Sequence, residues 1–155
     1  MKYIKIFVAG AALTIAACSG GSIGGIDAER SYSIALTSTQ QVPAPKPTTA
    51  AGSAEIIVYA SEIQYQLSAG AITGVTLAHI HSGVQGSTGQ IVTTLFQHGT
   101  GTGLISGLFA SGTLTASSLS GTTIESLKTL LASGNAYVDV HTTANPSGEI
   151  RGQIK

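Results

Sequence analysis

The sequence contains 155 residues, with seven Lys and Arg against seven Asp and Glu, so the formal net charge is zero and 9% of the residues are charged. This low and balanced charge excludes the basic patch that nucleic acid or anionic lipid head groups require, and we expect no nucleic-acid partner. Tryptophan is absent and cysteine occurs once, whereas glycine occurs 20 times. Such a composition is typical of one extracytoplasmic β domain with a modest core.

The chain opens with a targeting segment. Two lysines precede an apolar run over residues 6–15, which is too short to anchor a protein stably across a bilayer. The run leads into Ile15-Ala16-Ala17-Cys18, which resembles a bacterial lipobox, where the cysteine is lipidated and becomes the mature N-terminus. We therefore expect a lipoprotein signal peptide over residues 1–17, lipid attachment at Cys18 and a Gly/Ser-rich flexible tether over residues 18–30. An ordinary secretory signal with a chance cysteine is the alternative.

This segment also predicts where the protein resides. Cleavage leaves five Lys and Arg against seven Asp and Glu, a net charge of −2. Ser19 follows the lipidated cysteine, so the aspartate that retains lipoproteins in the inner membrane of Gram-negative bacteria is missing. We expect a protein of the bacterial cell envelope, anchored by its N-terminal lipid, with the outer membrane favoured. Because Cys18 is the one cysteine, no intramolecular disulfide can form.

Short runs of alternating apolar residues predict roughly eight strands after the tether. They fall near residues 32–36, 54–58, 63–67, 75–81, 91–96, 104–114, 136–142 and 149–154. Residues 68–74 are small and predict a connection, while three prolines make residues 41–49 a surface loop or a sheet edge. Asn145-Pro146 shortly before Gly148 predicts a hairpin turn between the last two strands.

One helix is predicted, over residues 122–133. Apolar residues recur on one of its faces at helical spacing, and Ser120 or Thr122 is available to cap its start. Its leucines are expected to seal one end of the domain. Together these elements predict a single all-β domain over residues 31–155, an antiparallel β-sandwich or flattened barrel with one short helix.

Two of the four histidines occur as His79-Ile80-His81 at the end of an alternating run. Side chains along a strand alternate between its faces, so both imidazoles point the same way, about 7 Å apart at Cβ. His141 ends a similar run near the C-terminus. Three neutral imidazoles on one surface suit copper or zinc. Alternatively the histidines are structural, their ring N–H groups holding the 82–89 loop and the 143–148 turn.

Two segments carry a resemblance to a known family. The first is Ala78-His79-Ile80-His81, followed by Gly83 and Gly89; the second runs from Gly134 to Gln153 and includes Tyr137, His141, Asn145-Pro146 and Gly148-Glu149-Ile150-Arg151-Gly152. They resemble the CHRD domain, named after chordin, and the resemblance covers about residues 32–155. In chordin the domain belongs to an extracellular antagonist of signalling ligands, and bacterial members are mostly exported proteins without an agreed activity. The resemblance implies a binding or structural module with a protein partner at the cell surface.

A weaker resemblance is to copper/zinc superoxide dismutase, where a His-x-His strand and a later Val-x-His strand supply copper ligands. The matching positions are His79, His81 and His141, with His98 as a fourth candidate. Residues 82–97 contain no histidine or aspartate, so the zinc half of that site has no counterpart. The resemblance implies the layered β architecture that superoxide dismutase shares with immunoglobulin-like domains. It also implies an alternative function, a copper-dependent redox protein.

Three further residues are expected to support the histidines. Asp139 shares a strand face with His141 and is expected to orient an imidazole, or else to be a solvated strand residue. Glu149 and Arg151 point outward on the last strand and are expected to form a cross-strand ion pair or hydrogen bonds to the hairpin turn. By analogy alone, Arg151 is an anion guide near a metal. The sequence favours a non-enzymatic module and identifies no catalytic residue.

Overall fold

A computed structural model of the chain describes residues 27–119 and 121–155. The strands are β1 (Arg30–Thr37), β2 (Ala51–Val58), β3 (Ile63–Thr73), β4 (Val75–Ser82), β5 (Ile91–Gln97), β6 (Leu104–Leu114), β7 (Ala136–Thr142) and β8 (Ile150–Ile154). The helices are η1 (Ser38–Gln40), η2 (Ala116–Ser118) and α1 (Ile124–Ala132). The predicted signal peptide and Cys18 lie outside the described residues.

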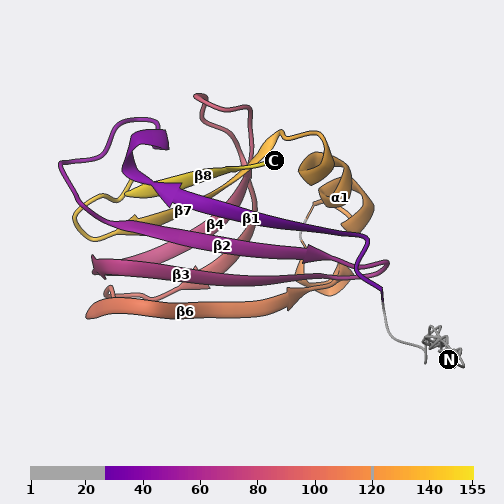
Figure 1. The fold of residues 1–155 in the computed structure, drawn as a ribbon, viewed down its shortest axis with the longest axis horizontal. Coiled ribbons are helices and arrows are strands. Elements are labelled where there is room, and N and C mark those ends of the chain that lie inside the picture. The colour runs from indigo at the N-terminus through magenta and orange to yellow at the C-terminus, as the bar shows by residue number, and fades with distance from the viewer. Residues whose placement is uncertain (1–26, 120) are drawn as a thin grey trace, which may run out of the picture.

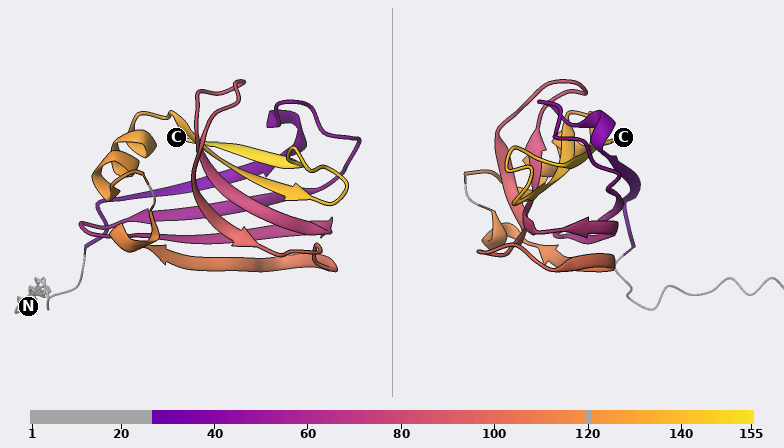
Figure 2. Two further views of the ribbon diagram at one scale, coloured as in Figure 1. Left: turned by 180° about the vertical axis from the view of Figure 1, so that it is seen from behind. Right: turned by 90° about the vertical axis from the view of Figure 1, so that its left-hand side faces the viewer.

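All eight strands belong to one antiparallel sheet, in the order β5-β4-β7-β8-β1-β2-β3-β6. The sheet curls round so that its two edge strands, β5 and β6, approach each other (Figures 1 and 2). There Phe96 and Phe109 pack edge to face at 5.4 Å, and the Tyr65 hydroxyl of β3 donates to the Leu95 carbonyl of β5 at 2.7 Å. The all-β prediction is confirmed, and of the two predicted shapes the flattened barrel is the closer.

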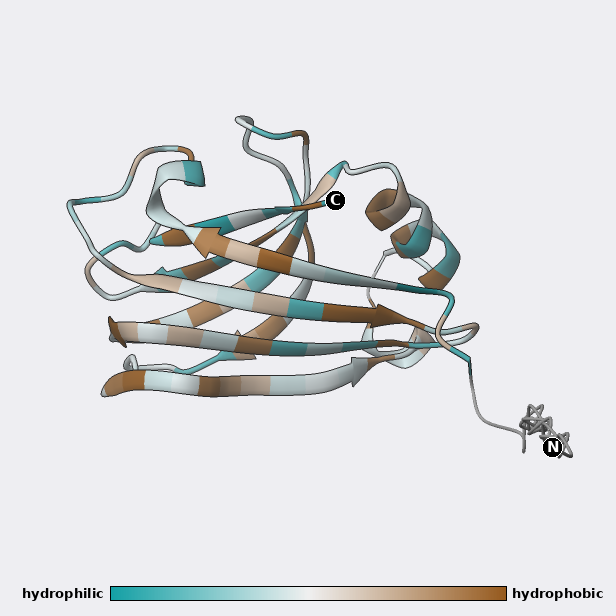
Figure 3. Ribbon diagram, viewed as in Figure 1, coloured by the Kyte–Doolittle hydropathy of each residue, from teal (hydrophilic) through white to brown (hydrophobic). Residues whose placement is uncertain are grey.

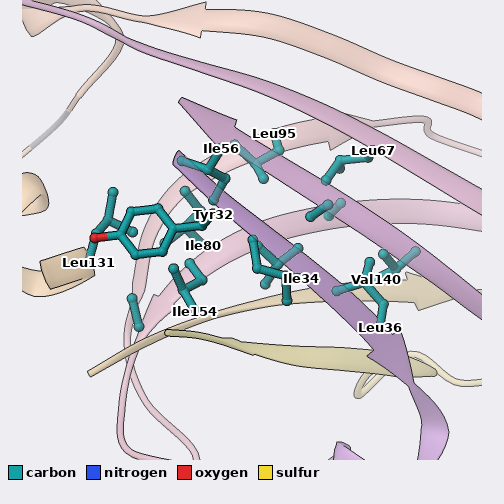
Figure 4. Packing of buried hydrophobic residues seen from close by; sticks show 14 of the residues in the cluster. Tyr32, Ile34, Leu36, Ile56, Leu67, Ile80, Leu95, Leu131, Val140 and Ile154 are labelled. Atoms are coloured by element: carbon teal, nitrogen blue, oxygen red, sulfur yellow. The ribbon is translucent and has the colours of Figure 1, made fainter. Parts of the chain in front are cut away.

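Strand periodicity decides which side chains enter the barrel. On β1, Tyr32, Ile34 and Leu36 are buried while Ser33 and Ala35 between them are exposed, an alternation visible along the strands in Figure 3. Figure 4 shows these three side chains meeting those of other strands inside the barrel. On β4 the inward residues are Ala78 and Ile80. The histidines that alternate with them therefore lie on the outer surface of the sheet.

The backbones of β8 and β1 approach each other closely at one corner of the sheet. β8 joins β1 through the pair formed by Thr37 and Arg151. Gly152 faces the core at this corner, and a Cβ atom there would lie 2.5 Å from the Ala35 carbonyl oxygen and would also collide with Ile34. A side chain cannot be accommodated without moving backbone, so the corner depends on glycine.

Two local predictions were wrong. Residues 68–73 continue β3, where Ser68, Ala69, Ile72 and Thr73 pair with β6. Register shifts before Ser68 and between Ala69 and Ile72 take up the small residues and let Ile72 enter the core. The helix is capped by Thr123, whose side chain accepts from the backbone N–H of Ser126, whereas Thr122 was expected to cap it; Ser120 lies outside the described residues. As predicted, α1 covers one end of the barrel (Figure 1). No described helix has the length and apolarity needed to cross a membrane.

Candidate metal centre

Strand pairing brings the outward residues of β4 and β7 together. His79 lies opposite Asp139, while Leu77 lies opposite His141 and His81 opposite Tyr137. Directly opposed residues on one face of an antiparallel pair are close enough to touch, and diagonal neighbours remain within reach of long side chains. His79, His81, Asp139 and His141 thus form one group, which we call the histidine cluster.

The ligand atoms of the histidine cluster all lie within 4.8 Å of one another. Nδ1 of His79 is 3.2 Å from Nε2 of His141. Oδ1 of Asp139 is 3.1 Å from Nε2 of both His81 and His141, and 3.9 Å from Nδ1 of His79. With metal bonds of 2.0–2.1 Å, neighbouring ligand atoms of a tetrahedral zinc site lie roughly 3.3 Å apart. The cluster is therefore close to the size that a bound ion requires.

Covering segments bury the cluster although it lies outside the barrel. His79, His81 and Asp139 are only 4%, 7% and 3% exposed. The 83–90 loop folds back over them, as its hydrogen bonds to β7 and β8 side chains show. An ion held here would be largely shielded from solvent.

Backbone carbonyls fix the tautomers of two imidazoles. Nδ1 of His81 is 3.0 Å from the Gly89 oxygen, and Nδ1 of His141 is 2.9 Å from the Pro146 oxygen. A carbonyl oxygen only accepts, so each Nδ1 carries a proton, and in the neutral form of each ring the lone pair of Nε2 faces the cluster. Nε2 of His141 is also placed to donate to Oδ1 of Asp139 at 3.1 Å when it carries a proton. A donor N–H bonded to a carbonyl on the far side of the ring is the arrangement typical of metal-binding histidine.

One buried nitrogen has no hydrogen-bond partner. Nε2 of His81 lies 3.1 Å from Oδ1 of Asp139, which is within hydrogen-bonding distance, but the geometry is not that of a hydrogen bond. With the proton on Nδ1, two lone pairs face each other at this distance and repel. A cation between them would remove the repulsion, so the residues present fit a metal ion.

The pKa shifts within the cluster also favour a bound metal ion. Burial raises the pKa of Asp139, but the hydrogen bond from His141 and the neighbouring imidazoles of His141 and His81 outweigh burial and lower that pKa to about 2. Burial, and then the neighbouring His141, lowers the pKa of His79 to about 4. Burial opposes protonation of His141 as well, but the Asp139 carboxylate raises its pKa overall. At neutral pH an ionised carboxylate and a neutral imidazole are thus already in the forms that bind metal.

The supporting residues predicted from the sequence have separate roles. Asp139, expected to orient an imidazole, places its carboxylate oxygen among the imidazole nitrogens themselves. Glu149 lies away from the cluster and accepts from Thr48 at 2.6 Å and from Thr142 at 2.5 Å. These bonds tie the proline-rich loop to the end of β7. His98 is exposed and lies outside the cluster.

Arg151 holds the glycine loop rather than the hairpin turn. Its side chain is 1% exposed and donates to the carbonyls of Ser87 at 2.6 Å and Val84 at 3.2 Å. No cross-strand ion pair of Arg151, one of its two expected roles, is among the salt bridges of the described residues. Arg151 reaches instead the 83–90 loop, which is distant in sequence and folds back over β8. Glu149 takes the other expected role, with hydrogen bonds from Thr142 and Asn145 at the hairpin turn.

Sequence reasoning missed Tyr137 and Gln153 as parts of the site. The Tyr137 ring stacks on His81, with centroids 4.8 Å apart and planes 5° apart. Gln153 donates to the carbonyls of Gly83 and Gly134, both at 2.8 Å. Both residues alternate in phase with Asp139 or Arg151, so strand parity alone would have placed them on the same outer face.

Glu149 predicts a dependence of stability on pH. Burial raises its pKa, but hydrogen bonds from Thr142, Thr48 and Asn145 outweigh burial and hold the pKa below its ordinary value of 4.5. The resulting stability is fully present above the unfolded pKa and is lost as pH falls through the lower folded pKa. We expect Glu149→Gln to unfold at lower urea concentration at neutral pH and to lose less stability on acidification. Equal acid sensitivity of the two proteins in urea titrations would contradict this.

Comparison with known proteins identifies the family. The CHRD domain matches residues 32–154, which include both histidine strands. No curated protein and no solved structure matches the chain, so the weaker resemblance to superoxide dismutase stays a prediction. The family match spans most of the chain and confirms the resemblance seen in the sequence, and the chain therefore belongs to the CHRD domain family.

Proposed function

We propose that this CHRD domain is a non-enzymatic binding module that holds one metal ion in the histidine cluster. The observation that carries the proposal is the contact between Nε2 of His81 and Oδ1 of Asp139, two buried acceptors 3.1 Å apart without a hydrogen bond. Copper and zinc both suit imidazole ligands. Copper is favoured by its higher intrinsic affinity, and zinc by the compact set of four ligands.

Burial favours a holding role over the copper-dependent redox function that the sequence also suggests. A redox substrate must reach the ion, whereas His79, His81 and Asp139 are each less than a tenth exposed. His141 is the most accessible member, and 12% of its side chain is exposed. Steady ligation of an ion needs no such access.

Metal analysis tests the proposal. The purified protein is expected to carry about one equivalent of copper or zinc per chain. A variant with His79→Ala and His81→Ala loses two ligands, so its affinity should fall by more than the roughly 10- to 100-fold that outer partners contribute. His98→Ala, outside the cluster, is the matched control and should keep the parent's metal content. Equal metal in the parent and the double variant would refute the site.

We also propose that a lipid on Cys18 tethers the domain to the bacterial cell envelope, with the outer membrane favoured and a protein partner at the cell surface. The support is the lipobox-like Ile15-Ala16-Ala17-Cys18. Cys18→Ala is expected to move the protein from membrane to soluble fractions, as measured by fractionation and immunoblotting. Continued membrane association of this variant would contradict the tether.

A further inference from the structure

Three planar groups are stacked beside the histidine cluster. The guanidinium carbon of Arg151 lies 3.4 Å from the centre of the Tyr137 ring. β4 and β8 flank Tyr137 on either side, and the His81 ring comes from β4, the side away from Arg151. It is nearly parallel to the Tyr137 ring, with centroids 4.8 Å apart. We call Arg151, Tyr137 and His81 the stacked column. One of its ends is a buried cation, and the other is a member of the cluster.

We propose that Tyr137 and Arg151 are positioning residues of the metal centre, which together fix the plane of the His81 ring so that its Nε2 points into the cluster. The proposal deepens the proposed metal-binding function and rests on it. Neither residue supplies a ligand atom to the cluster.

The His81 ring is held by a hydrogen bond and by a stacking contact. Its one hydrogen bond, from Nδ1 to the Gly89 oxygen, fixes a single point on the ring. The ring can still tilt about that point, and a tilt would swing the in-plane lone pair of Nε2 away from the ion. The parallel Tyr137 ring opposes the tilt, because aromatic contacts depend on the mutual orientation of the rings.

Tyr137 is held in place by Arg151. Arg151 is anchored by the Ser87 and Val84 carbonyls and by Oε1 of Gln153 at 3.3 Å. Within residues 27–119 and 121–155 it has no salt-bridge partner, so its charge meets carbonyl oxygens and the electron-rich ring face. A planar guanidinium can stack and donate along its edge at once, which a lysine ammonium cannot. The anchored guanidinium therefore keeps the Tyr137 ring against His81.

Gly89 links the stacked column to the 83–90 loop. The Gly89 N–H donates to the Tyr137 hydroxyl at 3.1 Å, and the Gly89 oxygen accepts from His81. A single loop residue thus bonds to both aromatic members of the column. Binding of an ion by Nε2 would strengthen the N–H donor on the other side of the His81 ring. The loop and the ion would then stabilise each other.

Zinc and cobalt titrations test the proposal. Full-length protein is purified in detergent, stripped of metal, and titrated with zinc against a chromophoric chelator and with cobalt by absorption spectroscopy. Tyr137→Leu is expected to lower zinc affinity by about 10- to 100-fold, the range for residues that orient a ligand, and to change the cobalt spectrum. Tyr137→Phe keeps the ring but loses the hydroxyl that accepts from the Gly89 N–H, so its affinity should fall less than that of Tyr137→Leu. His98→Ala, outside the cluster, is the control and should keep the parent's affinity and cobalt spectrum. Arg151→Lys should shift both readouts in the direction of Tyr137→Leu.

The outcomes separate this inference from the function on which it rests. A parent protein that binds neither zinc nor cobalt refutes the metal site itself. If the parent binds, and a folded Tyr137→Leu variant shows the parent's affinity and cobalt spectrum, the positioning role is overturned. Should Tyr137→Leu not fold, Arg151→Lys decides: unchanged affinity and an unchanged spectrum in that variant overturn the proposal, and a shift in both supports it.

Discussion

Gly89→Ala is expected to reduce the zinc or copper affinity of the protein by at least about 100-fold, the upper end of what outer partners of a metal site contribute. A Cβ atom at this position would overlap the Ser82 carbonyl, lying 2.6 Å from its carbon. The obstacle is backbone, and the Ser82 N–H is itself bonded to the Gln90 oxygen at 2.9 Å. The Gly89 peptide must therefore move, which removes the oxygen that fixes the tautomer of His81.

A competition titration with a chelator measures this effect. Gly99→Ala is the matched control, because a Cβ atom at Gly99 meets nothing within 4 Å. The control should bind metal as the parent does. If Gly89→Ala also binds metal as tightly as the parent, the 83–90 loop does not organise the His81 ligand.

Gly152→Ala is expected to lower the free energy of unfolding by about 3 kcal/mol, the upper part of the range for overpacked cores. The added methyl group would lie 2.5 Å from the Ala35 oxygen and 2.9 Å from Cδ2 of Leu36. Relief requires β8 to move away from its neighbour β1.

Urea unfolding followed by circular dichroism gives the free energy for the parent, for Gly152→Ala and for the control Gly103→Ala. A Cβ atom at Gly103 meets nothing within 4 Å, so this control tests the loss of a glycine without crowding. A change below about 0.5 kcal/mol in Gly152→Ala, the size typical of surface substitutions, would show that the corner can relax.

Strand periodicity made most of the fold predictable. The alternation of residues 75–81 placed His79 and His81 on one face, and the structure keeps them there. The extension of β3 could not be predicted, because Ile72 is the one large apolar residue within 68–73 and shows no alternation, and the stretch is held by pairing with β6. Local pattern thus identifies strands with strong side-chain signals and misses those that depend on a neighbour.

The candidate site was predictable only in part for the same reason. The three histidines could be grouped from their strands, but the position of Asp139 among them depends on the β4–β7 register, which places it opposite His79. The hydrogen-bond partner of Arg151 was harder still to predict from the sequence. Ser87 is 64 positions away, and the 83–90 loop brings it near by folding back over β8. Contacts that depend on how a loop folds back leave no periodic signal in the sequence.

The place where β5 meets β6 has a consequence for solubility. The barrel is joined there by the Tyr65 hydroxyl and by a pair of phenylalanines, rather than by a continuous ladder of backbone bonds. Both strands are free of charged residues. While the two edges face each other, neither presents its backbone to another molecule; if they separate, two neutral edges become templates for aggregation. The Tyr65 hydroxyl thus helps to keep these two edges from pairing with another copy of the chain.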